Sequence, residues 1–263
     1  MHRVQLAANC NNRCVFCAQG APFHGESAGY VQRARELESD AVMLVGGEPT
    51  LNSELVAWVE QFAASGTQVA MQTNARLLGR EPALAGRLAA AGLRQIEVGL
   101  LGSTAASHDY HTQTPGSFLE TCSGVRAAIA AGIQVRLTTL VTRSNFRQLA
   151  EWVRLAAALG VKELELRSEL RSVLPFGRAA TKPRLEPPHE LATPHILSAM
   201  EQAKRLGLEC RARAASEDDF SVSGATAPSQ VISIEKQARA NLAQADCSTH
   251  RTADPRTGEW SPA

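Results

Sequence analysis

Three cysteines close to the start of the chain, Cys10, Cys14 and Cys17, are separated by three and then two residues in the stretch CNNRCVFC. Three thiolates can hold a cubane iron-sulfur cluster by three of its iron atoms, which leaves the fourth iron open to a small molecule. Clusters with four cysteine ligands mainly carry electrons and lack this open position. A structural zinc site is the alternative, because it usually takes four protein ligands and His24 stands close enough in the sequence to be the fourth.

Two glycines and an acidic residue, Gly46, Gly47 and Glu48, form a second candidate site in the stretch GGEPT. Glycine lacks a Cβ, so the backbone at Gly46 and Gly47 can approach a ligand closely. The structural alternative is an ordinary turn from a strand into a helix, with Pro49 ending the strand. The pattern therefore predicts either a ligand-binding edge or a tight turn at this point.

The elements that must position these residues alternate between short apolar runs and longer amphipathic segments. The predicted strands are Arg3 to Ala8, Ala41 to Val45, Gln68 to Thr73, Gln95 to Leu101, Gln134 to Val141 and Lys162 to Ser168. The predicted helices are about Val31 to Leu37, Ser53 to Ala64, Pro82 to Ala91, Ser117 to Ala131, Asn145 to Leu159 and Pro194 to Leu206. Six β–α units in series predict an α/β fold with a parallel sheet and right-handed crossovers, a partial (β/α)6 TIM-like barrel. A candidate last strand runs from Leu208 to Ala212.

In parallel α/β folds, ligands bind at the carboxyl ends of the strands. The cysteines follow the first predicted strand, and GGEPT follows the second. The third strand ends in the stretch QTNA, which contains Asn74, and the loop SHDYHT follows the fourth strand. We therefore expect all four segments to lie on one rim of the barrel.

The C-x3-C-x2-C pattern, with the aromatic Phe16 just before its last cysteine and Gly-Gly-Glu-Pro after the second strand, resembles the radical S-adenosylmethionine (SAM) superfamily. The resemblance covers about residues 1 to 212. It implies that Cys10, Cys14 and Cys17 bind one 4Fe-4S cluster. The open iron of that cluster would chelate the amino and carboxylate groups of the methionine moiety of SAM.

The same resemblance implies a cofactor-binding role for Phe16 and for the edge formed by Gly46, Gly47, Glu48 and Pro49. This edge is expected to receive the ammonium group of the methionine moiety. The implied activity is enzymatic: an external one-electron donor of flavodoxin or ferredoxin type reduces the cluster, and SAM is cleaved to methionine and a 5'-deoxyadenosyl radical. That radical takes a hydrogen atom from an unactivated C–H position of a substrate.

Residues 96 to 118 look like the fourth strand and following loop of the peptide-modifying branch of this superfamily, and residues 140 to 149 and 174 to 179 also look like that branch. Many of its members carry auxiliary clusters on further C-terminal cysteines. Here only Cys210 and Cys247 remain in the second half of the chain, so we expect one cluster and no auxiliary-cluster domain. A peptide or natural-product precursor is the leading substrate. Small-molecule or cofactor biosynthesis, a non-catalytic iron-sulfur or zinc protein, and RNA modification are the alternatives.

Strand alternation places charged side chains inside the predicted barrel. Glu97 shares a strand face with Gly99, and Arg167 shares one with Glu165 and Glu169, opposite the apolar positions of the same strands. Unpaired buried charge is costly, so we expect Arg167 to pair with a carboxylate. In the functional interpretation, Glu97 or Arg167 contacts the ribose or carboxylate of the cofactor, and a purely structural ion pair is the alternative.

Two further residues are cofactor-site candidates: Asn74 at the end of the third strand and Thr139 on the fifth, with rim hydrogen bonding as the structural alternative. In the loop after the fourth strand, His108, Asp109 and His111 are candidates for substrate contact or proton transfer. A solvated polar loop is the alternative for these side chains.

Composition limits the other classes of function. The 263 residues, 44% of them hydrophobic, are enough for one large domain, which we place at residues 1 to 214, with a polar tail or lid from 215 to 263. Because 27 basic and 26 acidic residues give a net charge of +1, nucleic acid is not an expected partner. The sequence has no apolar run of about 18 residues, and the cysteines come too early for a signal peptide, so we expect a cytoplasmic protein without membrane contact.

Overall fold

The computed structural model describes residues 1–17, 40–168, 178 and 183–213, which all lie in one compact unit, Met1–Thr226. The predicted helix at Val31 to Leu37 and the predicted tail from residue 215 fall outside the described residues, as does His24. Within the described part of the chain, no helix is long and apolar enough to cross a membrane.

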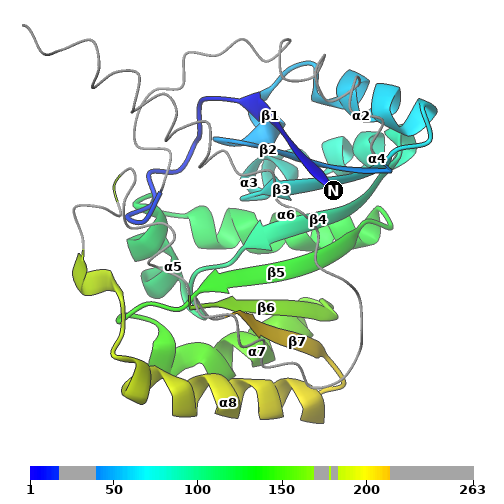
Figure 1. The fold of residues 1–263 in the computed structure, drawn as a ribbon. Coiled ribbons are helices and arrows are strands. Elements are labelled where there is room, and N and C mark those ends of the chain that lie inside the picture. Colours follow the sequence, from blue (N-terminus) through cyan, green and yellow to red (C-terminus); the bar gives the residue numbers. More distant parts are fainter. Residues whose placement is uncertain (18–39, 169–177, 179–182, 214–263) are drawn as a thin grey trace, which may run out of the picture. The chain divides into compact units, whose positions relative to one another are not determined.

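Seven parallel strands form one sheet in the order β1 to β7, and the first and last strands do not pair, so the described sheet is open (Figure 1). The strands are β1 (His2–Ala7), β2 (Ala41–Gly46), β3 (Gln68–Thr73), β4 (Leu93–Gly99), β5 (Gln134–Leu140), β6 (Glu163–Arg167) and β7 (Glu209–Arg213). The predicted partial TIM-like barrel is confirmed. Strand β7 extends the sheet beyond six β–α units, at the position of the candidate last strand.

Helices and short 3-10 turns connect the strands. They are η1 (Pro49–Leu51), α2 (Leu55–Ala64), α3 (Arg76–Arg80), α4 (Pro82–Ala91), α5 (Ala105–Thr112), α6 (Ser117–Ala130), η2 (Phe146–Gln148), α7 (Leu149–Ala158), η4 (Pro183–Leu185) and α8 (His189–Arg205). Helix α8 begins at His189 rather than at the predicted Pro194, which lies inside the helix. The other predicted helices within the described residues are present, and their boundaries shift by a few residues.

Two short helices near the rim differ from the sequence-based expectation. The segment expected to be a polar loop forms α5, and the Thr104 hydroxyl caps it by accepting a hydrogen bond from the Ser107 N–H at 3.3 Å. Helix α5 buries His108 and His111 instead of apolar residues, so it lacks the apolar periodicity by which helices are recognised. Helix α3 begins after Ala75, which has a left-handed φ of 58°.

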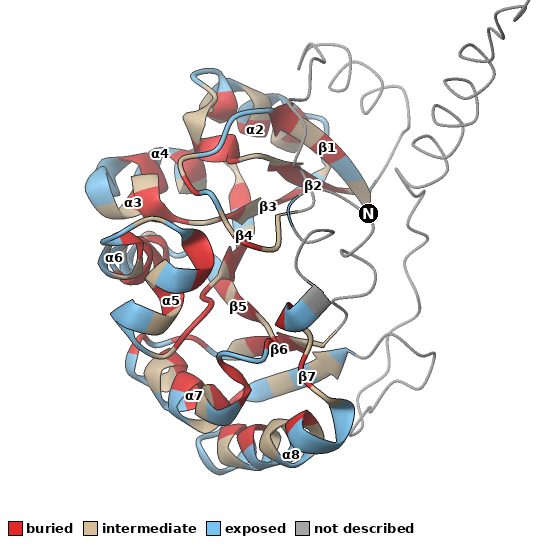
Figure 2. Ribbon diagram, turned by 90° about the vertical axis from the view of Figure 1, so that its left-hand side faces the viewer, coloured by how far each residue is buried: buried red, intermediate tan, exposed pale blue. Residues whose placement is uncertain are grey.

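The two faces of the sheet differ in chemistry. One face packs under the helices and forms the main apolar core, which includes Val4, Leu44, Met71, Ile96 and Leu137. Figure 2 shows the described α-helices on this side of the sheet, with buried positions where they meet the strands. Because successive strand residues alternate in direction, the polar residues between these positions point to the opposite, open face.

Helices α3 and α6 approach each other closely because each carries a glycine at the contact. A Cβ added to Gly124 would lie 1.9 Å from Ala75 O, and a Cβ added to Gly79 would lie 2.1 Å from Glu120 O. No side chain fits at either point without movement of the backbone. This contact places Arg76, the first residue of α3, directly opposite Glu120 of α6.

Candidate active site

The cysteine loop, residues 8–17, leaves the carboxyl end of β1 and lies against the end of α5. The Arg13 N–H donates a hydrogen bond to Thr112 O at 2.9 Å, and the Val15 N–H donates to His111 O at 2.9 Å. These two bonds tie the middle of the loop to a helix that is far away in the sequence. The three predicted cluster ligands therefore lie on one anchored segment.

The GGEPT segment packs directly against the cysteine loop. The Gly47 N–H donates to Ala7 O and the Glu48 N–H donates to Asn9 O, each at 2.8 Å. An added Cβ at Gly47 would lie 2.2 Å from Asn9 O, and one at Gly46 would lie 2.5 Å from Ala7 O. Close approach to a ligand is the reason that the sequence suggests for these glycines. The structure gives another reason, the close approach of two backbone segments to each other.

The carboxyl group of Glu48 is buried, with 1% of the residue exposed. It accepts hydrogen bonds from Thr50 N–H at 3.1 Å, Thr50 Oγ1 at 2.7 Å, Thr73 Oγ1 at 2.5 Å and Asn74 N–H at 2.7 Å. Burial raises the pKa of Glu48, and these hydrogen bonds offset only part of the shift. Because the chain itself supplies four donors, we interpret Glu48 as fixing the ends of β2 and β3 rather than reaching the methionine ammonium with its carboxyl group.

Asn74 connects this edge to the cysteine loop. Its side-chain nitrogen donates to Asn11 Oδ1 at 2.7 Å and to the Cys10 sulfur at 3.8 Å. The Asn12 N–H also donates to the Cys10 sulfur, at 3.4 Å. Hydrogen bonds to sulfur are among the features that set the potential of an iron-sulfur cluster. The structure therefore places Asn74, a candidate from the third strand, beside the first predicted ligand.

The three thiols are of the type that binds an iron-sulfur cluster, and they lie close enough together to raise the pKa of Cys14. The pKa of Cys14 is raised to about 12, first by burial and then by Cys10 and Cys17. The pKa of Cys10 is also raised, mainly by burial, so a metal centre must displace protons from these thiols. Among the described residues, no group of three or more His, Cys, Asp or Glu side chains could hold a single metal ion. A cluster differs from a single ion because each cysteine binds a different iron.

The open face of the sheet carries a chain of ion pairs. The Glu97 carboxylate lies 3.2 Å from Arg136 Nη1 and 3.2 Å from Arg167 Nη2. The Arg167 Nε lies 2.6 Å from Glu165 Oε1, and the Arg136 Nη2 lies 2.7 Å from Glu163 Oε2. The expected pairing of Arg167 with a carboxylate is confirmed. Contact of Glu97 or Arg167 with the cofactor stays a prediction.

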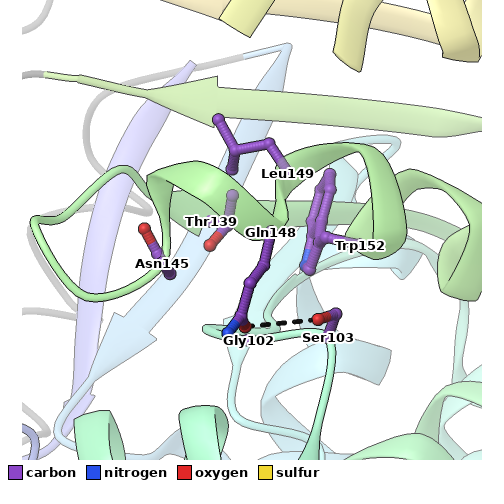
Figure 3. A pocket seen from close by; sticks show the side chains of 7 residues that line it. All are labelled: Gly102, Ser103, Thr139, Asn145, Gln148, Leu149 and Trp152. Atoms are coloured by element: carbon purple, nitrogen blue, oxygen red, sulfur yellow. Dashed lines mark hydrogen bonds between the residues drawn. The ribbon is translucent and has the colours of Figure 1, made fainter. Parts of the chain in front are cut away.

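Thr139 faces away from these ion pairs. Together with Leu137 it lies on the helix-facing side of β5, and it lines a small hollow that is too tight to hold a water molecule (Figure 3). The other lining residues are Gly102, Ser103, Asn145, Gln148, Leu149 and Trp152. The Thr139 hydroxyl is buried and has no hydrogen-bond partner in the described chain. This orientation does not favour contact of Thr139 with the cofactor, because alternation puts its neighbour Thr138 on the open face instead.

The two histidines predicted to face the substrate are buried within α5. His108 Nδ1 accepts a hydrogen bond from the Leu101 N–H at 3.1 Å, and burial lowers the pKa of His108 to about 4. His111 Nδ1 lies 2.6 Å from Ser107 O, so this nitrogen carries the proton and Nε2 accepts from Thr142 Oγ1 at 2.8 Å. Burial lowers the pKa of His111 as well. Both rings are neutral at neutral pH and bonded within the chain, which favours a structural role.

Asp109 caps the next helix. Its carboxylate accepts hydrogen bonds from the Gly116 N–H at 2.7 Å, the Ser117 hydroxyl at 2.8 Å and the Phe118 N–H at 2.9 Å. Burial opposes a low pKa, but these bonds outweigh it and lower the pKa of Asp109. The carboxylate therefore fixes the start of α6, and the geometry favours this role over substrate contact.

Phe16 and Pro49, the remaining cofactor-site candidates, lie in the two adjacent loops. Phe16 packs with Val15, Leu140 and Leu185 in a small apolar cluster. Pro49 is buried at the start of η1. Both residues stabilise the loops in which they lie, and their contact with the cofactor stays a prediction.

Three further residues build the candidate site although the motifs in the sequence do not single them out: Thr73, Arg76 and Arg136. The alternation rule locates Arg136, because it is aligned with Glu97 across the β4–β5 pair. Arg76 directly follows QTNA, but its burial, with 3% of the residue exposed, depends on the contact between α3 and α6. No local pattern reveals a contact between segments so far apart in the sequence.

The amino-acid sequence is similar to those of several named enzymes. An AdoMet-dependent heme synthase of Methanosarcina barkeri is 27% identical over 165 residues, which cover 59% of this chain and 46% of the relative. A probable GTP 3',8-cyclase of Saccharolobus solfataricus is 32% identical over 178 residues, which cover 62% of this chain and 55% of the relative. The chain therefore spans about half the length of these curated relatives.

Solved structures share the fold. SuiB of Streptococcus suis matches with a TM-score of 0.62 and 13% identity over 81% of this chain and 50% of SuiB. Methylornithine synthase (PylB) matches with a TM-score of 0.59 and 12% identity over 93% of this chain and 81% of PylB. The family model of the Radical SAM superfamily matches residues 4–156, which include the cysteine loop and the GGEPT edge. Because this match covers more than half of its residues, the chain belongs to the radical SAM superfamily.

Proposed function

We propose that this radical SAM enzyme acts on a small molecule in cofactor-type biosynthesis rather than on a peptide. The observation that carries the proposal is the sequence similarity to relatives named heme synthase and GTP 3',8-cyclase. Both names describe the chemistry of small molecules. We give this similarity more weight than the resemblance to the peptide-modifying branch, because the alignments with the two relatives cover 59% and 62% of this chain.

The family uses a 4Fe-4S cluster and SAM, and different residues of this chain would bind each of them. Cys10, Cys14 and Cys17 would hold the cluster, and the edge from Gly46 to Glu48 would bind SAM. When bound, these cofactors supply a one-electron cleavage of SAM that generates a 5'-deoxyadenosyl radical, for which an external reductant is needed. The protein binds and orients both groups and keeps water away from them.

The open face between β4 and β7 favours a substrate with an anionic group. The Arg136 and Arg167 side chains are 23% and 31% exposed and bind Glu97 directly. Arg213 of β7 is 61% exposed, and its Nε lies 3.7 Å from Glu165 Oε1. Of these three arginines Arg213 has the largest exposed fraction, and a guanidinium group suits a carboxylate or phosphate.

A peptide remains the second candidate substrate, because residues 96 to 118 resemble the peptide-modifying branch. SuiB bound to its precursor peptide SuiA has a TM-score of 0.60 to this chain but only 12% identity. A likeness at this identity supports the shared fold and not a shared substrate.

An experiment that follows the hydrogen atom abstracted from the substrate can distinguish a small-molecule substrate from a peptide. An extract of cells grown in heavy water is split into a small-molecule fraction and a peptide fraction, and each is incubated anaerobically with reconstituted enzyme, reductant and SAM. Mass spectrometry then measures deuterium in 5'-deoxyadenosine, because the radical keeps the atom that it abstracts. Label from the small-molecule fraction alone supports the proposal, and label from the peptide fraction alone contradicts it. The Cys14→Ala variant controls for label that does not depend on the cluster.

A further inference from the structure

Arg76 is a buried cation that bonds to the cysteine loop between the first two cysteines. Only 3% of the residue is exposed. Its Nη1 donates to Asn12 Oδ1 at 2.9 Å and also to the main-chain oxygen of Asn11. Its Nε donates to Glu120 Oε2 at 2.6 Å. A single guanidinium group therefore joins helix α6 to the loop.

The arrangement needs the fork of an arginine. The acceptors lie on two separate segments, and a guanidinium group presents several N–H donors in fixed directions, whereas lysine offers one compact charge. A buried cation also needs a partner charge. Burial opposes ionisation of Glu120, but hydrogen bonds from Arg80 and Arg76 outweigh it and lower the pKa of Glu120. Glu120 is therefore ionised at neutral pH and compensates the charge of Arg76.

Arg80 provides a matched comparison within the same helix. Its Nε and Nη2 each lie 2.7 Å from Glu120 Oε1, so it binds the same carboxylate as Arg76. Its side chain is 52% exposed, and within the described chain its hydrogen bonds go to Glu120 and not to the cysteine loop. The two arginines therefore share an ion pair and differ in their contact with the loop.

We infer that Arg76 is a positioning residue that holds the Asn11–Asn12 segment in place, so that Cys10 and Cys14 are presented to the cluster in a fixed arrangement. Asn11 Oδ1 also accepts the hydrogen bond from Asn74, whose nitrogen lies 3.8 Å from the Cys10 sulfur. Movement of Asn11 would therefore disturb both the loop and a donor beside the first ligand. The role does not depend on which substrate the enzyme uses.

Amide hydrogen exchange on the metal-free protein tests this role without any catalytic readout. The variants are Arg76→Met, which removes the fork, Arg76→Lys, which keeps a charge, and Arg80→Met as the matched control. The reporters are the amides of Arg13 and Val15, which are hydrogen-bonded to the end of α5. We expect their exchange to be at least about tenfold faster in Arg76→Met, since both hydrogen bonds from the charged guanidinium group to the loop are lost. Exchange in Arg80→Met should match the wild type, with Arg76→Lys intermediate.

Reconstitution gives a second readout. The Arg76→Met variant should bind less iron per chain than the wild type, and the electron paramagnetic resonance signal of its reduced cluster should change less when SAM is added. Arg80→Met should match the wild type in both measurements. If only the ion pair with Glu120 mattered, Arg76→Lys would restore both values completely, and that outcome would overturn the inference.

A variant on the loop side guards against general unfolding of the Arg76 variants. Asn12→Ala removes the side-chain acceptor on the loop and leaves the pair between Arg76 and Glu120 in place. It should speed exchange at Arg13 and Val15 without changing exchange in the strands. Equal loop exchange and equal iron content in Asn12→Ala, Arg76→Met and Arg80→Met would show that Arg76 does not position the loop.

Discussion

The β1–β3 edge and the β4–β7 face both carry charged and polar side chains, but the hydrogen bonds that hold these side chains differ in kind. At the β1–β3 edge, Glu48 is 1% exposed and accepts its hydrogen bonds from main-chain N–H groups and threonine hydroxyls. On the β4–β7 face, long side chains bind each other, and exposure rises from 23% at Arg136 to 61% at Arg213. The first region is held by backbone geometry, and the second by ion pairs.

Under the proposed function, this difference suits one region to the cofactor and the other to the substrate. Short side chains and main-chain groups lose little conformational freedom when a ligand binds, so the β1–β3 edge is organised in advance for one constant cofactor. Arg136 and Arg167 compensate the buried carboxylates of Glu97 and Glu165 and are therefore held in place. Arg213 is 61% exposed and its pair with Glu165 is long, at 3.7 Å, so Arg213 can turn to an anionic ligand at low cost. We therefore expect the β4–β7 face to be the more adaptable of the two regions.

The largest expected effect is at the cysteine loop. The Cys14→Ala variant should lose both the cluster and the cleavage of SAM. Only two of the three cysteine ligands remain in this variant, and they are too few to hold the cluster. Iron content, the absorption of the reconstituted protein and formation of 5'-deoxyadenosine measure this. The control is Cys122→Ala, because Cys122 is buried in α6, away from the loop. Cleavage at the wild-type rate in Cys14→Ala would refute the assigned mechanism.

A pair of glycines tests the comparison directly. An added Cβ at Gly47 would lie 2.2 Å from Asn9 O, whereas one at Gly99, on the open face of β4, meets no atom within 4 Å. Gly47→Ala should therefore lower the free energy of unfolding by about 1–3 kcal/mol through forced backbone movement. Gly99→Ala should leave it within about 0.5 kcal/mol of the wild type. Urea titration of the metal-free proteins measures both values, and similar losses in the two variants would contradict the difference between the regions.

The titration of Glu48 should make the free energy of unfolding depend on pH. Burial raises the pKa of Glu48 in the folded chain above that of the unfolded chain. The unfolded chain then loses this proton at lower pH, so the group's contribution to stability falls as the pH rises from the ordinary glutamate pKa through the raised value. Glu48→Gln has no proton to lose, so its stability should not show this decrease. Urea titrations of both proteins across this pH range test the expectation, and parallel curves would contradict it.

The two regions also differ in how far the sequence predicts them. The cysteine loop and the GGEPT edge are local motifs, and the strands before them are apolar runs with clear boundaries, so both fold and edge could be predicted. Strand alternation also predicted the ion pair of Arg167. The same rule places Arg136 on the open face and Thr139 on the helix side, but only when it is applied to β5 with the register of its neighbours.

The remaining features depend on contacts that no local pattern encodes. Helix α5 buries His108 and His111, so its sequence has the polarity of a loop. Arg76 reaches the cysteine loop only because Gly124 lets Ala75 approach α6 closely. In both cases the deciding partner lies tens of residues away in the sequence, and tertiary packing overrides the local signal.

The smallest expected effect concerns Arg213 on the β4–β7 face. Arg213→Gln should leave the free energy of unfolding nearly unchanged, because exposed ion pairs contribute little. If an anionic group of the substrate binds here, the concentration of the small-molecule fraction needed for half-maximal deuterium transfer should rise about tenfold, as for loss of one hydrogen bond to a charged group. Cleavage of SAM without substrate should stay at the wild-type rate. Arg154→Gln, which removes an exposed arginine paired with Glu151 on α7, is the matched control. An equal response in both variants would mean that the exposed charge on β7 does not select the substrate.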